Sequence, residues 1–274
     1  MKRKYRLISF DLDDTLLRND KTIPKETIDW IRQYREDGGI VVLASGRDIT
    51  EITDYMHQLG MDRGRKGYII SSSGAYLWDL EEDQVVEFPS FSSHEARVIT
   101  EALLRQNEVV QPMIVCKKMD YIITLKPTII DKLRFSYYRI RGNTRTLITP
   151  SEVEKIIDHI EKVRVERSNG TDYDKCISEV PEAHYRVIEG HRVDFFHNGV
   201  DKSAGVRVAI QKEGISPDEV LIFGDDENDI TCFENFVNSV AMGNAVQQIK
   251  ELARFQTCSN EHNGVLRFLI ENNV

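Results

Sequence analysis

Three aspartates lie within four residues near the start of the chain, directly after a short apolar run. They are Asp11, Asp13 and Asp14, and the run is Leu7-Ile8-Ser9-Phe10, which is typical of a buried strand. Carboxylates this close repel each other and raise each other's pKa, and a bound hard cation such as Mg²⁺ relieves the repulsion. Alternation along an extended chain puts Asp11 and Asp13 on the same side. A metal site is therefore one interpretation, and an acidic surface turn is the other.

The same arrangement occurs twice more in the chain. Ser45 follows the apolar run 40–44, and the acidic stretch from Asp225 to Asp229 follows the apolar run 220–223. In open α/β sheets ligands bind at the carboxyl ends of the strands, so residues far apart in sequence meet at one crevice. A second acidic cluster at an equivalent place favours metal-dependent chemistry over two unrelated surface turns.

Two of these aspartates have the chemistry for phosphoryl transfer. The carboxylate of Asp11 could act as a nucleophile that carries a phosphoryl group, and Asp13 could act as general acid and base. Mg²⁺ held by Asp11, by the main-chain carbonyl of Asp13 and by Asp225 would orient the phosphate and offset its charge.

Other side chains could hold the phosphate itself. The hydroxyls of Thr15 and Ser45 can donate to phosphate oxygens, and Lys202 supplies a positive charge. Each also has a plainer interpretation: Thr15 in a turn, Ser45 at a helix cap, and Lys202 as a solvated lysine. Arg47 could contact either the substrate or the acidic loop.

These residues need a parallel sheet to bring them together. The pattern strand–helix–strand–helix–strand over residues 7–71 predicts an α/β fold with right-handed crossovers. A hairpin over 76–88 leads out of it, and the core pattern resumes near residue 201. We therefore expect a Rossmann-like core over 1–83 and 196–274, with an inserted α+β cap domain over 84–195. Within the cap we expect helices over 94–105 and 151–160, and strands over 121–125 and 192–196.

The composition limits the classes of partner. A net charge of −9 over 274 residues argues against general binding of nucleic acid or membrane surfaces. The four cysteines have no CxxC spacing, so neither a zinc site nor a redox dithiol is indicated. The apolar run after the basic N-terminus is too short for a signal peptide or a membrane span. We expect a cytoplasmic protein, either a monomer or a homodimer.

The motifs, in order, resemble those of the haloacid dehalogenase (HAD) superfamily, specifically its Cof-like, class IIB phosphohydrolases. The resemblance spans nearly the whole chain. The matching stretches are Phe10-Asp11-Leu12-Asp13-Asp14-Thr15-Leu16-Leu17, Ala44-Ser45-Gly46-Arg47, Gly199-Val200-Asp201-Lys202, Gly224-Asp225-Asp226-Glu227-Asn228-Asp229, and Val240-Ala241-Met242-Gly243-Asn244-Ala245.

The resemblance implies Mg²⁺-dependent hydrolysis of small phosphate monoesters, often sugar phosphates, through an aspartyl-phosphate. It also implies that Gly46 and Asn228 bind phosphate and that Asp229 supports the site. The sequence departs from the family pattern in three places. Asp14 and Asp226 add negative charge near the metal, and Ser73 stands where asparagine is frequent.

Two other functions remain open. A sugar phosphomutase or phosphotransferase would use the same nucleophile and metal, and a non-catalytic phosphometabolite-binding regulator would use the same scaffold. A hinged cap would close over the crevice, select the substrate and raise the pKa of Asp13. The run of bases and aromatics from Arg134 to Arg145 is our predicted place for this selection, with a solvated surface as the alternative.

Overall fold

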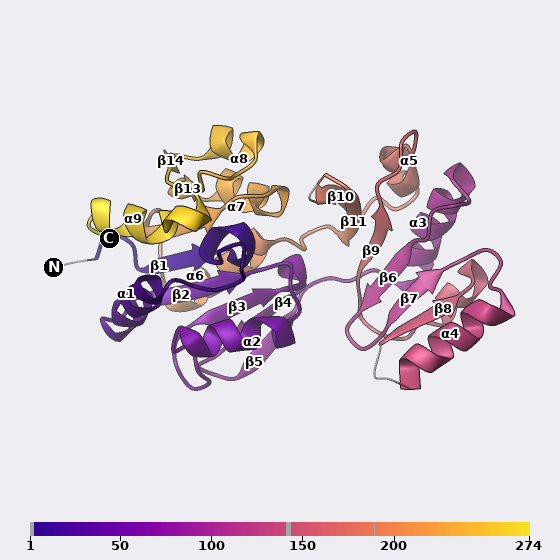
Figure 1. Cartoon of the computed structure of the whole chain (residues 1–274), viewed down its shortest axis with the longest axis horizontal. Helices are drawn as coiled ribbons and strands as arrows, with labels where there is room; N and C mark the ends of the chain where they lie inside the picture. Colours follow the sequence, from indigo (N-terminus) through magenta and orange to yellow (C-terminus); the bar gives the residue numbers. More distant parts are fainter. Residues whose placement is uncertain (1–2, 141–143, 189) are drawn as a thin grey trace. The chain divides into compact units, whose positions relative to one another are not determined.

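The computed structural model describes residues 3–140, 144–188 and 190–274, without the side chains of residues 132, 134, 136 and 138–140. The chain forms two compact units, Met1–Phe88 with Asp201–Val274 and Pro89–Val200 (Figure 1). We call the first the core unit and the second the cap unit, and describe each by itself.

The core unit is built on an eight-stranded sheet in the order β14-β13-β12-β1-β2-β3-β4-β5. Its parallel strands are β1 (Leu7–Phe10), β2 (Ile40–Ala44), β3 (Tyr68–Ser71), β12 (Val220–Gly224), β13 (Ser239–Ala241) and β14 (Phe255–Gln256). The hairpin β4 (Tyr76–Asp79) and β5 (Gln84–Glu87) adds two antiparallel strands. Strands β1, β2, β3, β12 and β13 are buried along their whole length, as expected for parallel strands covered on both faces.

Six helices pack around this sheet: α1 (Lys25–Glu36), α2 (Ile49–Gln58), α6 (Lys202–Glu213), α7 (Ile230–Asn235), α8 (Gln247–Leu252) and α9 (Gly264–Glu271). Helix α2 begins with a capping box formed by Asp48 and Glu51, and Asp201 caps α6. Helix α6 ends at Gly214, whose φ of 59° lies in the left-handed region. Helix α1 packs on β2, whereas α2 and α6 pack on β3. The predicted α/β fold with a parallel-sheet core is confirmed.

The cap unit contains a six-stranded mixed sheet in the order β10-β11-β9-β6-β7-β8. Its elements are α3 (Ser93–Gln106), β6 (Met113–Cys116), β7 (Asp120–Ile123), α4 (Ile129–Ile140), β8 (Arg145–Ile148), β9 (Ile160–Glu166), α5 (Tyr173–Ile177), β10 (Ala183–Ile188) and β11 (Arg192–His197). Apolar side chains of α3 and α5 pack with Val163, Val165, Val193 and Phe195 in a separate hydrophobic core. The unit therefore has a core of its own.

Two features of the cap unit differ from the sequence-based expectation. Residues 151–160, expected as a helix, form a short 3₁₀ turn over Pro150–Lys155, capped by Thr149, and then lead into β9. The helix does not continue because the chain becomes extended at Ile156 and enters β9 at Ile160, where it pairs with β6 and β11. In addition, β5 pairs with β4 and belongs to the core sheet, so the core unit extends to Phe88 instead of residue 83.

Within the described part of the chain, every helix is too short or too polar to cross a bilayer. The four cysteines are reduced thiols, and three of them are buried.

Candidate active site

The sheet order brings the predicted site residues to one edge. Strand β1 lies between β12 and β2, and Phe10 is in register with Phe223 and Leu43. Asp11, Ser45 and Asp225 each follow the end of one of these three strands. The backbone N–H of Asp11 donates to the carbonyl of Phe223 over 3.1 Å, which extends the sheet hydrogen bonding by one residue. The predicted convergence at the carboxyl ends of the strands is what the structure has.

Lys202 is the centre of the site. It is the first residue of α6 and its side chain is 0% exposed. Its Nζ donates to Asp11 Oδ1 (2.6 Å), Asp229 Oδ1 (2.7 Å) and Asn228 Oδ1 (2.9 Å). Burial alone would lower the pKa of Lys202, but the charges of Asp11 and Asp229 outweigh it and raise the pKa. The interpretation of Lys202 as a solvated lysine is wrong.

Three buried carboxylates surround this lysine. Oxygens of Asp11, Asp225 and Asp229 lie within 4.8 Å of one another. Burial and the neighbouring carboxylates raise the pKa of Asp225 to about 9, and burial raises that of Asp11 to about 7 although Lys202 opposes the shift. Thr15 Oγ1 donates to Asp225 Oδ1 over 2.6 Å. Three carboxylates against one ammonium leave an excess of negative charge, which fits a divalent cation with oxygen ligands.

Asp229 differs from the other two because both its oxygens are engaged. Oδ1 accepts from Lys202, while Oδ2 accepts from the backbone N–H groups of Asp225 (3.0 Å) and Asp226 (3.4 Å). Gly224 makes room for it, since a Cβ there would lie 2.5 Å from Asp229 Oδ2. Asp229 thus shapes the loop and positions Lys202, whereas Asp11 and Asp225 have more oxygen capacity left for a metal.

The carboxylate of Asp13 makes a different set of contacts. Arg47 donates to it through Nε and Nη2, both over 2.7 Å, and Lys21 Nζ donates over 2.8 Å. Partial burial would raise the pKa of Asp13, but Arg47 and Lys21 outweigh it and lower the pKa to about 2. The rise of this pKa that we expect on cap closure stays a prediction. Among the described residues, the Asp13 side chain is not part of the carboxylate cluster, so a metal contact there would have to use its main-chain carbonyl.

Sequence reasoning missed two residues of this loop. Lys21 is the second cation on Asp13, and Asn244 Nδ2 donates to the carbonyl of Asp14 over 2.7 Å. Asp14 has φ 58°, in the left-handed region, so the backbone turns tightly directly after Asp13. Arg47 contacts the acidic loop, one of the two roles considered for it. The sequence gives no signal for the contact between Lys21 and Asp13, because pairing of opposite charges across a loop has no fixed spacing.

The phosphate-binding residues predicted from the second motif lie beside Asn228. Ser45 is buried and its Oγ accepts from the backbone N–H of Arg47 over 3.2 Å, as a cap does. A Cβ at Gly46 would lie 3.3 Å from Ser73 Oγ and 3.9 Å from Asn228 Nδ2, so these three residues are neighbours. Ser73 has φ 61°, a conformation that asparagine adopts more readily than serine.

The cap unit holds a second charged cluster that the sequence did not indicate. Arg164 donates to Asp194 through Nε and Nη2, both over 2.8 Å, while Lys162 Nζ lies 3.8 Å and Arg192 Nε 3.4 Å from the same carboxylate. Arg164, Asp194 and Arg186 are in register across β9, β11 and β10, so they share one face of the sheet. Three cations thus surround Asp194, while Asp120 and Glu161 act on Lys162 and Arg164 more weakly.

The run from Arg134 to Arg145, predicted to select the substrate, is only partly described. The side chains of Arg134, Tyr138 and Arg139, and the whole of Arg141, lie outside the described residues. Tyr137 is half-exposed on α4, and Arg145 Nε lies 3.7 Å from Asp120 Oδ2. This prediction stays untested.

The family model of haloacid dehalogenase-like hydrolases matches residues 8–269 of the chain. The 5-amino-6-(5-phospho-D-ribitylamino)uracil phosphatase of Bacillus subtilis is 25% identical, over 99% of this chain and 98% of its own. The pyridoxal phosphate phosphatase of Escherichia coli is 24% identical, over 96% of this chain and 97% of its own.

Solved structures share the fold. A HAD phosphatase from Bacteroides thetaiotaomicron has a TM-score of 0.78 at 18% identity, covering 98% of this chain and 96% of that one. A subclass IIB sugar phosphatase has a TM-score of 0.75 at 19% identity, covering 98% of this chain and 99% of that one. The match of the family model over nearly the whole length, on a core whose motifs meet at one edge of the sheet, shows that the chain belongs to the haloacid dehalogenase-like hydrolases, the family that its motifs predicted.

Proposed function

We propose that this protein is a Mg²⁺-dependent phosphatase that hydrolyses small phosphate monoesters, with Asp11 as the nucleophile. The observation that carries the proposal is the buried contact of Lys202 with Asp11 inside a cluster of three carboxylates. The contact fixes one oxygen of Asp11 and offsets part of the charge that would repel a phosphate. The phosphatase names of the relatives in B. subtilis and E. coli support the same reaction.

The proposed reaction has two halves. In the first, a carboxylate oxygen of Asp11 attacks phosphorus, the bond to the leaving oxygen breaks, and Asp13 gives that oxygen a proton. In the second, Asp13 takes a proton from water, whose oxygen attacks the aspartyl-phosphate and releases inorganic phosphate and free Asp11. Mg²⁺ held by Asp11 and Asp225 would supply charge neutralisation and orientation of the phosphate.

Asp13 needs new hydrogen-bond partners for the first half. With Arg47 and Lys21 bound to it, its pKa of about 2 keeps it ionised at neutral pH. A substrate phosphate would compete for the same two cations, and the pKa of Asp13 rises toward that of an acid able to donate as each cation turns to the phosphate. Arg47 and Lys21 therefore link substrate binding to the protonation of Asp13 in this proposal.

A trapping experiment tests the nucleophile. The protein is mixed with ³²P-labelled substrate and Mg²⁺ and quenched in acid, and we expect a labelled acyl phosphate that is lost at alkaline pH. Asp11→Asn should carry no label, and Asp13→Asn should retain it longer because hydrolysis of the intermediate slows. Label that persists on Asp11→Asn would contradict the mechanism.

Product analysis separates hydrolysis from the two alternatives. Inorganic phosphate released in proportion to the substrate consumed supports a phosphatase. An isomerised sugar phosphate without free phosphate would indicate a mutase. Tight binding of phosphorylated metabolites without turnover would indicate a regulator, which the intact set of Asp11, Asp13, Lys202 and Asp225 argues against.

We also propose that the charged cluster of the cap unit, Lys162, Arg164, Arg192 and Asp194, helps to select the substrate; we call it the cap cluster. Lys162, Arg164 and Arg192 exceed the charge of Asp194, so a second anionic or strongly polar group on the substrate would complete the cluster. This favours phosphorylated metabolites with such a group over simple alkyl phosphates. A panel of sugar, nucleotide and cofactor phosphates measures the preference.

We place the protein in the cytoplasm, which its four reduced thiols support. We further propose that it is a monomer or a homodimer.

A further inference from the structure

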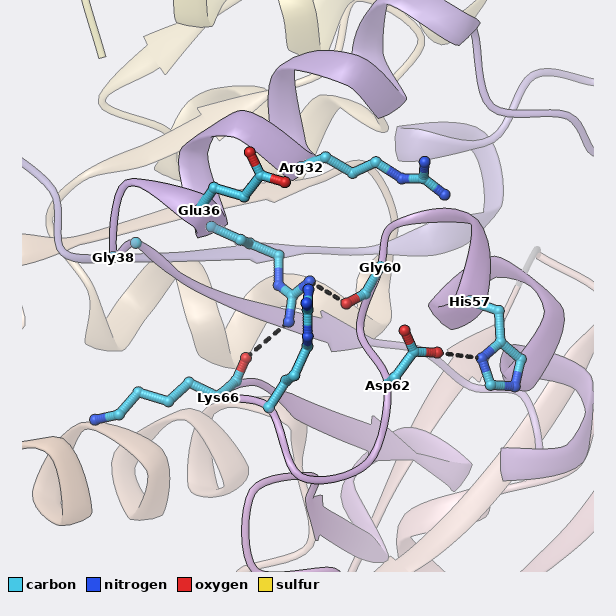
Figure 2. A pocket seen from close by; sticks show the side chains of 10 residues that line it. Arg32, Glu36, Gly38, His57, Gly60, Asp62 and Lys66 are labelled. Carbon is cyan, nitrogen blue, oxygen red and sulfur yellow. Dashed lines mark hydrogen bonds and ion pairs between the residues drawn. The ribbon is translucent and has the colours of Figure 1, made fainter.

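A cationic pocket lies in the core unit, away from the proposed active site. It has a volume of about 650 Å³, within the roughly 300–1,000 Å³ typical of small-molecule sites. Figure 2 shows its lining, which comes from the C-terminal parts of α1 and α2 and from the segment that leads into β3. The lining residues are Arg32, Arg35, Glu36, Gly38, Gly39, His57, Gly60, Asp62, Arg65 and Lys66.

The pocket is at the opposite edge of the sheet from the carboxylate cluster. Gly38 and Gly39 directly precede β2, and Lys66 precedes β3, so the pocket lies at the amino ends of these parallel strands. Asp11, Ser45 and Asp225 follow the carboxyl ends of parallel strands of the same sheet. A ligand of this pocket is therefore not in contact with the proposed catalytic residues.

Positive charge exceeds negative charge in the pocket, in a protein whose net charge is −9. Three arginines and one lysine face Glu36 and Asp62, and Asp62 Oδ1 is already 2.7 Å from His57 Nδ1 (Figure 2). Lys66 Nζ pairs with Glu213 over 2.9 Å outside the pocket lining. This leaves the guanidinium groups as the pocket's available cations.

Arg35 is held rigidly among these cations. Its Nη1 donates to the carbonyls of Leu59 (3.1 Å) and Gly60, and its Nη2 to that of Lys66 (3.0 Å). Its Nε is buried and has no hydrogen-bond partner among the described residues. Burial and then the charge of Arg65 lower the pKa of Arg35, and Asp62 opposes this shift.

Two further arginines have donors to spare. Arg32 uses only Nε, which donates to the carbonyl of Gln58 over 2.8 Å. The side chain of Arg65 makes no hydrogen bond or ion pair within the parts of the chain that the structure describes. Guanidinium forks match the oxygens of phosphate groups in geometry as well as in charge.

We propose that this pocket is a binding site for a small polyanion that bears phosphate groups, separate from the catalytic site. Arg35 forms its fixed base, and Arg32 and Arg65 close on the ligand from the exposed side. This goes beyond the proposed phosphatase activity and does not depend on it, because no residue of the pocket belongs to the carboxylate cluster.

Calorimetric titration of the full-length protein with inorganic pyrophosphate tests the proposal. The buffer contains EDTA, because without a metal the carboxylate cluster repels anions. We expect one pyrophosphate per chain, and at least about a tenfold weaker Kd for the double variant Arg32→Gln/Arg65→Gln, since each charge-assisted hydrogen bond that is removed costs about a factor of ten. Both side chains are exposed, so the variant should fold and keep its Mg²⁺-dependent phosphatase rate.

A matched control removes two exposed arginines elsewhere, Arg105→Gln/Arg207→Gln, with the same change of net charge. This control should bind pyrophosphate as the unmodified protein does. Equal weakening in both double variants, or no binding to the unmodified protein at millimolar pyrophosphate, would overturn the proposal. A parallel titration with citrate distinguishes phosphate from carboxylate chemistry, and tighter binding of citrate would overturn the assignment to phosphate.

Discussion

Two buried lysines in the described part of the chain lie in opposite electrostatic settings. Lys202 in the core unit is 0% exposed and has three oxygen acceptors within 2.9 Å, two of them carboxylates. Lys162 in the cap unit is 3% exposed, and its nearest carboxylate oxygen, on Asp194, is 3.8 Å away and shared with Arg164. The environment raises the pKa of Lys202, whereas burial lowers that of Lys162.

The comparison shows which sign of charge each cluster lacks. The core cluster has more carboxylates than cations, and the cap cluster has more cations than carboxylates. A buried excess of charge is costly until an ion or ligand of the opposite sign balances it. The core cluster therefore suits a divalent metal, and the cap cluster suits an anionic part of the substrate.

The largest effect is expected in the core. Asp11→Asn removes the nucleophile and a metal ligand together, so phosphate release should fall by about 10⁴-fold or more for every substrate, as for other catalytic nucleophiles. Initial rates of phosphate release, with circular dichroism to show an intact fold, measure this. A variant that keeps its rate on any substrate would break the assignment of chemistry to the core.

The two lysines can be compared directly. Lys202→Met leaves Asp11 and Asp229 without their cation and should lower the free energy of unfolding by about 3–5 kcal/mol, whereas Lys162→Met removes an excess cation and should cost about 1 kcal/mol or less. Urea unfolding in EDTA measures both. Equal losses would show that the two settings are energetically alike and would remove the basis of the comparison.

A smaller effect is expected for substrate choice. Arg192 Nε is buried 3.4 Å from Asp194 without a hydrogen bond among the described residues, and the side chain as a whole is 25% exposed, so a substrate could reach only the exposed end of its guanidinium group. Arg192→Gln should lower kcat/KM about 10–100-fold for substrates with a second anionic group, and leave p-nitrophenyl phosphate nearly unchanged. Arg105→Gln on α3 is the control. If all substrates fall by the same factor, the cap cluster does not select.

The last effect concerns pH. The raised pKa values of Asp225 (about 9) and Asp11 (about 7) mean that the folded, metal-free protein binds more protons than the unfolded chain between about pH 4 and 9. Stability in EDTA should therefore fall as pH rises across that window. Mg²⁺ displaces those protons, so its stabilisation should grow with pH.

Thermal unfolding at pH 5.5 and 8.5, with EDTA or with Mg²⁺, measures this dependence. Each pH unit over which only the folded state keeps the Asp225 proton lowers the stability by about 1.4 kcal/mol, and about 1 kcal/mol corresponds to roughly 2–4 °C, so the expected shift is on the order of 10 °C. Asp225→Asn should lose most of it. A melting temperature in EDTA that rises with pH, or a shift unchanged in Asp225→Asn, would contradict the pKa assignment for the cluster.

The sequence by itself predicted the core and the edge of the sheet at which its candidate site residues lie. Apolar runs followed at once by Asp11, Ser45 and Asp225 indicate parallel strands and place these residues at one edge, because the carboxyl ends of such strands coincide. The capping box at Asp48 and the helix that begins at Lys202 could also be predicted, because the signals for a helix start lie within a few residues.

Only the tertiary structure decided how charges pair across the chain. The cations on Asp13 are Lys21 and Arg47, and the burial of Lys202 against Asp11 depends on residues 191 positions apart. The helix expected over 151–160 stops after a 3₁₀ turn, and the chain enters the cap strand β9 at Ile160, whose partners β6 and β11 supply hydrogen bonds that no local pattern encodes. Side-chain contact and strand pairing are long-range choices, so the pKa of Asp13 and the cap cluster follow from the fold alone.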